Sequence, residues 1–178
     1  SSAASDVYKR QALVVFDLLF RILIELYGEK KVTYVRNITD IDDKIIEASK
    51  SKKIDISDLT KSVTEKFHKD YKILFCLNPS KEPRATDHVE GMINMTKKLI
   101  ELNAAYEKDG HVFFKVTSFK KYGKLSNKNP DDLKVGARVE VSKLKNDPLD
   151  FVLWKPSNSN DPGWESPWGR GRHVSYTH

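Results

Sequence analysis

Polar side chains crowd the short segment Asn37–Lys44, which has the sequence Asn-Ile-Thr-Asp-Ile-Asp-Asp-Lys. Three carboxylates and one hydroxyl fall between residues 39 and 43, those of Thr39, Asp40, Asp42 and Asp43. Acceptors at this density can bind an amine, a ribose hydroxyl or a metal ion, and Asp-x-Asp-Asp suits Mg²⁺, which takes carboxylate oxygens. They can equally cap a helix and interact with its dipole, and the spacing alone gives the two explanations about even weight.

The surrounding residues predict a strand that leads into a helix. Lys31–Arg36 is rich in β-branched and aromatic residues, and a helix is expected to start near Asp40, with Thr39 or Asp40 as its cap. Before them, Ala12–Tyr27 predicts an apolar core helix that Gly28 ends. Helix, strand and helix in this order suggest a βαβ-type unit without its first strand. In such sheets ligands bind beyond the carboxyl ends of the strands.

Two more helices are predicted before the hydrophobic pattern changes. One starts at Ser57, and the residues expected on its buried face are Leu59, Val63, Phe67, Tyr71 and Leu74. The other starts at Asp87, which forms a capping-box pattern with Glu90. Between them, Asn78–Pro83 is a stiff connector and a candidate boundary.

Alternating residues then predict strands. Ala105–Lys108 and His111–Val116 flank Asp109-Gly110, a strong hairpin signal. Further strands are expected at Ala137–Val141 and Asp150–Trp154. Residues 155–171 predict a long loop whose two tryptophans either line a pocket or anchor the loop to the core.

Composition narrows the class of protein. The net charge of +6 allows a polyanionic partner without requiring one, and the lysines of Phe119–Lys124 and Lys143–Lys145 fit either a phosphate backbone or a solvated loop.

The single cysteine, Cys76, excludes an internal disulfide and agrees with a cytoplasmic protein. The apolar stretch 12–27 is too short to span a bilayer. His88 and His111 are expected at the surface, and no histidine pairs with Cys76 at zinc-ligand spacing.

The two ends fit the remainder poorly. Asp6–Gln11 and Val174–His178 resemble translated sequencing-library adapter. We therefore expect residues 1–11 and 173–178 to be non-native, and exclude them from the fold prediction.

Six blocks, taken in order, resemble the cysteinyl-tRNA synthetase family. They are Thr33–Ile46, Glu82–His88, Tyr122–Ser126, Gly136–Val141, Asp147–Lys155 and Trp164–Arg172. The resemblance implies an α/β fold, with a partial Rossmann-type catalytic half at 12–77 and an α+β connective-peptide insertion with a β-hairpin at 78–155. A loop at 156–172 would return to the catalytic fold.

The resemblance also implies an activity and a site. The family activates L-cysteine with ATP to cysteinyl-adenylate and transfers it to tRNA(Cys), and a bound Zn²⁺ recognises the thiolate. Thr39 would approach the backbone end of bound cysteine, and Asn37 and Asp40 would shape that wall. A monomer is expected.

Several family signatures have no counterpart here. The His-Ile-Gly-His motif and a zinc-ligand cysteine would precede Ala12, and the remaining zinc ligands and the Lys-Met-Ser-Lys-Ser loop would follow His173. Cys76 does not match a zinc ligand. We therefore expect an internal fragment that has lost most ligands for ATP and zinc and is inactive alone. The alternatives are the related cysteine ligase of mycothiol synthesis and a non-catalytic RNA-binding module.

Overall fold

A computed structural model describes residues 2–127 and 143–174, with side chains described from Gln11 onward. It divides into two compact units, Ser1–Asp87 and His88–His178. Each unit is described by itself.

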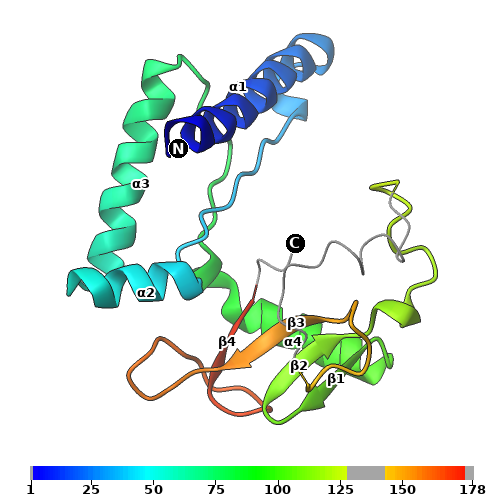
Figure 1. Cartoon of the computed structure of the whole chain (residues 1–178). Coiled ribbons are helices and arrows are strands. Elements are labelled where there is room, and N and C mark those ends of the chain that lie inside the picture. The colour runs from blue at the N-terminus through cyan, green and yellow to red at the C-terminus, as the bar shows by residue number, and fades with distance from the viewer. Residues whose placement is uncertain (1, 128–142, 175–178) are drawn as a thin grey trace. The chain divides into compact units, whose positions relative to one another are not determined.

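The first unit is built from three α-helices in its described part, α1 (Ser2–Tyr27), α2 (Asp43–Lys52) and α3 (Ile56–Ile73), with a 3₁₀ turn η1 (Glu29–Lys31) (Figure 1). Gly28 ends α1 as predicted, because it adopts a positive φ of 85° and its N–H donates to the carbonyl of Ile24 at 2.8 Å. The predicted start at Ala12 is wrong, since α1 begins at Ser2. Residues 2–11 contain no glycine or proline, so nothing in them stops a helix from propagating.

The predicted strand Lys31–Arg36 is not formed as such. Two isolated parallel bridges take its place, Val35 with Lys81 and Ile38 with Arg84. The N–H of Arg36 donates to Lys81 and that of Ile38 to Pro83, at 3.0 and 2.8 Å. Pro83 itself has no N–H to return, and this leaves a gap between the two bridges.

Helix α2 begins later than predicted. Its cap is Asp42, whose carboxylate accepts a hydrogen bond from the Ile45 N–H at 2.7 Å, and not Thr39 or Asp40. Helix α3 is capped by Asp55. Of its predicted buried face, Tyr71 is 1% exposed, whereas Val63 is 59% exposed, so that prediction holds only in part.

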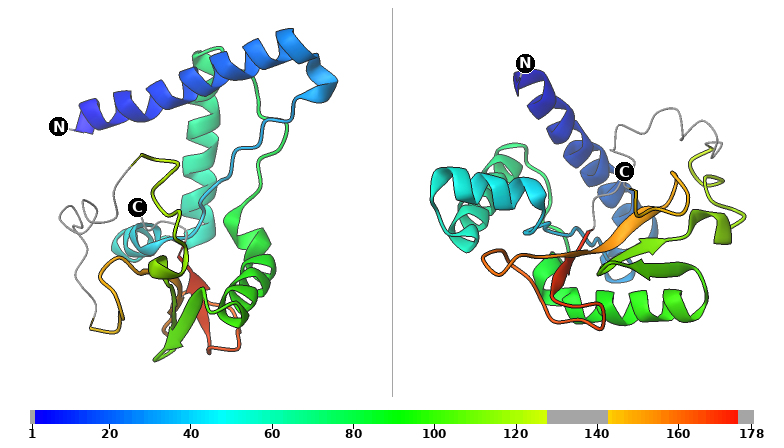
Figure 2. Two further views of the ribbon diagram at one scale, coloured as in Figure 1. Left: turned by 90° about the vertical axis from the view of Figure 1, so that its right-hand side faces the viewer. Right: turned by 60° about the horizontal axis from the view of Figure 1, so that its bottom comes forward.

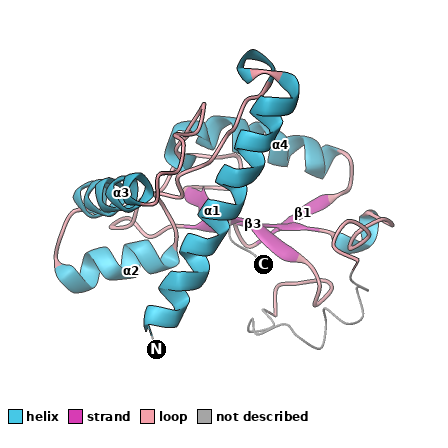
Figure 3. Ribbon diagram, turned by 90° about the horizontal axis from the view of Figure 1, so that it is seen from above, coloured by secondary structure: helices cyan, strands magenta, loops and turns pink. Residues whose placement is uncertain are grey.

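The described part of the second unit packs one α-helix, α4 (Val89–Glu101), on a four-stranded antiparallel sheet (Figures 2 and 3). The strands, in sheet order, are β1 (Ala105–Lys108), β2 (His111–Phe114), β3 (Phe151–Pro156) and β4 (Gly171–His173). The buried core is Val89, Ala105, Val112 and Trp154. The predicted hairpin is confirmed, and both turn residues have positive φ, 51° at Asp109 and 73° at Gly110.

Three predictions for the second half had different outcomes. The strand near Asp150–Trp154 is confirmed as β3, and Ala137–Val141 lies outside the described residues. The capping box of Asp87 is wrong, because Asp87 lies in a 3₁₀ turn, η2 (Ala85–His88), and α4 has no side-chain cap. Strand β4 falls at the end of the predicted long loop, where three residues are too few for a sequence pattern.

Candidate functional site

A cavity of about 470 Å³ lies within the first unit. Three segments line it: residues 37–39, α2 and α3. The lining residues are Asn37, Ile38, Thr39, Lys44, Ile45, Ala48, Lys52, Leu59, Thr60, Val63, Thr64 and Phe67. The size suits a small organic ligand, and the apolar lining with a few polar groups is typical of such sites.

Asn37 and Thr39 form a polar strip on this lining. The side-chain amide of Asn37 donates to the Thr39 hydroxyl at 3.2 Å, and both residues are solvent-exposed. In extended chain, alternate residues point to the same side, and this explains why these two side chains meet. The strip offers a hydroxyl and an amide to a ligand, and Lys44 and Lys52 supply positive charge in the same lining.

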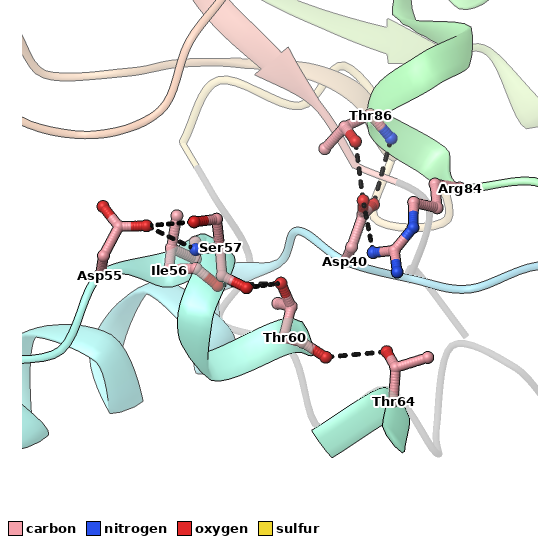
Figure 4. Close-up of polar contacts among 8 residues, drawn as sticks. All are labelled: Asp40, Asp55, Ile56, Ser57, Thr60, Thr64, Arg84 and Thr86. Carbon is pink, nitrogen blue, oxygen red and sulfur yellow. Dashed lines mark hydrogen bonds and ion pairs between the residues drawn. The ribbon is translucent and has the colours of Figure 1, made fainter. Parts of the chain in front are cut away.

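Asp40 lies outside this lining and is only 7% exposed. Its carboxylate accepts hydrogen bonds from the N–H and the hydroxyl of Thr86, at 3.1 and 2.7 Å, and lies 3.8 Å from Arg84 (Figure 4). The side chain therefore fixes the turn that follows Thr39 and does not face the cavity.

All residues that line the cavity lie within a region of the chain that matches a known protein family. Residues 4–175 match the family model described as the tRNA synthetases class I (C) catalytic domain. The chain belongs to this family. The resemblance found in the six sequence blocks is thereby confirmed.

Curated relatives of this class I (C) synthetase chain agree with the family. It is 52% identical over 160 residues to the cysteine–tRNA ligase of Pelagibacter ubique (strain HTCC1062) and 56% identical over 160 residues to that of Beijerinckia indica subsp. indica. It is 53% identical over 159 residues to the cysteine–tRNA ligase of Maricaulis maris (strain MCS10). These matches cover 89–90% of the chain and 34–35% of each relative, so the chain spans about a third of their length.

The wall that α3 contributes to this synthetase domain was not recognised as part of a site from the sequence. Thr60, Val63, Thr64 and Phe67 follow one another at helical spacing and all line the cavity. The Thr60 hydroxyl donates to the Ile56 carbonyl at 2.9 Å and the Thr64 hydroxyl to the Thr60 carbonyl at 2.7 Å (Figure 4). Because Val63 and Phe67 also fit a core face, the sequence pattern points to burial rather than to a cavity wall.

The family resemblance implies a zinc ion, but the described ranges 2–127 and 143–174 contain no set of side chains that could hold one. There, no three side chains of His, Cys, Asp or Glu gather closely enough to hold a metal ion. The carboxylates of Asp40 and Asp42 are instead engaged by hydrogen bonds to Thr86 and Ile45.

The remaining candidate residues of the synthetase chain lie outside the cavity lining. His88 is exposed, and His111 stacks on Phe113 with ring centroids 5.9 Å apart. Burial raises the pKa of the half-buried Cys76 thiol, with a further contribution from the Asp17 carboxylate, so the thiol stays protonated near neutral pH.

Trp168 packs edge-on against Trp154 at 5.8 Å, and both Trp164 and Trp168 pack on the core, which agrees with an anchoring role. In the described part of the chain no helix has the length and apolar character that crossing a membrane requires.

Proposed function

We propose that this chain is part of an enzyme that activates L-cysteine with ATP to cysteinyl-adenylate and transfers the cysteinyl group to tRNA(Cys). The observation that carries the proposal is the identity of 52–56% over 160 residues to proteins named cysteine–tRNA ligase. In this proposal residues 12–77 belong to a partial Rossmann half and 78–155 to the connective-peptide insertion, with 156–172 leading back to the catalytic fold. Zn²⁺ and most ATP contacts would come from parts of the enzyme outside this chain.

The polar strip of the cavity is our candidate for one wall of the cysteine-adenylate site. The Thr39 hydroxyl can accept a hydrogen bond from the ammonium of cysteine, and the Asn37 amide, 3.2 Å away, holds that hydroxyl in place. Lys44 and Lys52 in the same lining favour an anionic ligand such as an acyl-adenylate. Asp40 would act indirectly, by fixing the turn through Thr86.

Cysteine-dependent ATP–pyrophosphate exchange tests the activity. The full reading frame is recovered, or residues 4–175 replace the matched region of a curated relative, and exchange is measured with and without cysteine. Exchange that depends on cysteine supports the proposal, and its absence in a folded, full-length protein would contradict it. We expect no exchange from the 178-residue chain alone; activity of that chain would refute this part.

Thr39→Val tests the wall in the same full-length enzyme. The substitution keeps the shape of the side chain and removes the hydroxyl, and the lost hydrogen bond to a charged group is expected to raise the KM for cysteine about tenfold or more. Thr33→Val, at an exposed position of the same extended segment, is the matched control. Equal KM and kcat values for the Thr39 variant and the parent enzyme would remove Thr39 from the site.

A further inference from the structure

Arg36 immediately precedes the polar strip and joins three segments of the first unit. Its backbone N–H donates to Lys81 at 3.0 Å, and its side-chain Nε donates to Glu82 at 3.1 Å. The guanidinium carbon lies 4.7 Å from the ring centre of Phe67 and 4.2 Å from that of Tyr71, both on α3. With 12% of its side chain exposed, Arg36 is largely withdrawn from water.

Glu82 completes the arrangement on the side of α3. Its second carboxylate oxygen lies 2.6 Å from Nε2 of His68, so one carboxylate contacts both Arg36 and α3. Burial by itself raises the pKa of Glu82, but hydrogen bonds and charges from Arg36 and His68 outweigh it, and the pKa is lowered overall. Glu82 is therefore held ionised opposite the guanidinium.

These contacts connect the two walls of the cavity. Asn37 and Thr39, which follow Arg36 in the chain, and Phe67 of α3, over whose ring the guanidinium lies, all belong to the lining. We propose that Arg36 is a positioning residue that holds the Asn37–Thr39 strip at a fixed distance from α3, with Glu82 as its partner. The inference rests on the proposed function of this cavity as the cysteine-adenylate wall. Arg36 itself does not line the cavity, so its effect on substrate would be indirect.

The aromatic contacts make this role specific to arginine. A planar guanidinium can stack on two rings while its edge binds a carboxylate, whereas the compact ammonium of lysine cannot do both. Arg36→Lys keeps the charge and Arg36→Met keeps much of the length, so the pair separates charge from geometry. Glu82→Gln removes the opposite charge while the shape of that side chain is retained.

Amide hydrogen exchange of the 178-residue chain tests the positioning directly. The Ile38 N–H, which donates to Pro83 at 2.8 Å, reports on the segment, and the Lys115 N–H, which donates to Ala104 at 2.8 Å, is a reference in the other unit. For Arg36→Met we expect Ile38 exchange to be about tenfold faster relative to Lys115, because local opening is no longer opposed by the ion pair. Unchanged relative exchange would overturn the inference.

The matched control is Lys69→Met, which removes a positive charge from an exposed position of α3. Its relative Ile38 exchange should equal that of the parent chain. If Arg36→Met does not fold, Arg36→Lys and Glu82→Gln decide the question, and both should accelerate Ile38 exchange. An effect of Lys69→Met as large as that of Glu82→Gln would refute a role for the specific contacts.

Kinetics of the full-length enzyme supply a second measurement. Misplacement of the strip should raise the KM for cysteine about tenfold and leave the KM for ATP within about twofold. Loss of folded enzyme would lower kcat and leave both KM values unchanged, and that result would overturn the inference. If the parent enzyme shows no cysteine-dependent exchange, the proposed function fails, while hydrogen exchange in the chain still decides the role of Arg36.

Discussion

Removal of the Asp40 carboxylate is the perturbation for which the structure gives the most definite expectation. Asp40 is 7% exposed and accepts two hydrogen bonds from Thr86, one from the backbone N–H and one from the hydroxyl. Thr86 lies 46 residues further along the chain, so these bonds close a long loop within the first unit. The ion pair with Arg84 is longer, at 3.8 Å, and the Arg84 side chain is 39% exposed, so it should contribute little.

The expected magnitudes follow from the number of bonds lost. A hydrogen bond to a charged group contributes about 1.5–3 kcal/mol, so Thr86→Val, which removes only the hydroxyl, should destabilise the unit by about 2 kcal/mol. Asp40→Ala loses both bonds and leaves the Thr86 N–H without its acceptor, for an expected cost of about 3–5 kcal/mol. Asp87→Asn, an exposed carboxylate next to Thr86, is the control and should change the free energy of unfolding by less than about 0.5 kcal/mol.

Urea unfolding followed by far-UV circular dichroism measures these differences, because α1, α2 and α3 lie in the first unit. All three tryptophans lie in the second unit, so tryptophan fluorescence follows that unit separately. The reasoning would be refuted if Asp40→Ala cost no more than Asp87→Asn. It would also fail if Thr86→Val cost more than Asp40→Ala, because the hydroxyl supplies only one of the two bonds.

Three further expectations concern other parts of the chain. Burial and the neighbouring Asp150 carboxylate, to which the Tyr106 hydroxyl donates, raise the pKa of Tyr106 from 10.0 to about 12. The contribution of Tyr106 to stability is therefore full below pH 10 and is lost as the pH rises towards 12. In an alkaline unfolding titration, the Tyr106→Phe variant should lack this pH-dependent loss of stability. Leu18 and Leu26, 58% and 67% exposed on α1, should promote self-association, and replacing both by Gln should reduce light scattering; a monodisperse parent chain would contradict this. Trp168→Ala should destabilise the second unit by about 3 kcal/mol in tryptophan-monitored urea unfolding, and a cost below about 1 kcal/mol would argue against its anchoring role.

Local signals explain the predictions that succeeded. Gly28 ends α1 and Asp109-Gly110 forms the hairpin turn because each requires a positive φ that few other residues adopt easily. The alternation of β1 and β2 acts over neighbouring residues in the same way. Family membership also comes from the order of residues along the chain, and the comparisons confirm it.

Partners distant in sequence explain the predictions that failed. The sequence predicts Thr39 or Asp40 as the cap of a helix, but the Asp40 carboxylate binds Thr86, and the cap of α2 is Asp42. The strand at 31–36 depended on its neighbour, and Pro83 in that neighbour lacks the N–H that a continuous ladder requires.

The sequence by itself determined the family, the turns and the polar composition of Asn37–Lys44, because these are properties of residues close together in the chain. Only the tertiary structure decided which of those polar groups face a cavity and which are withdrawn into the fold. Phe67 and Asn37 come to line the same cavity through contacts of Arg36 with Phe67 and with Glu82, which lies 46 positions away from Arg36 in the chain. Burial and hydrogen bonding to distant partners select one role for each side chain, and no local pattern encodes that choice.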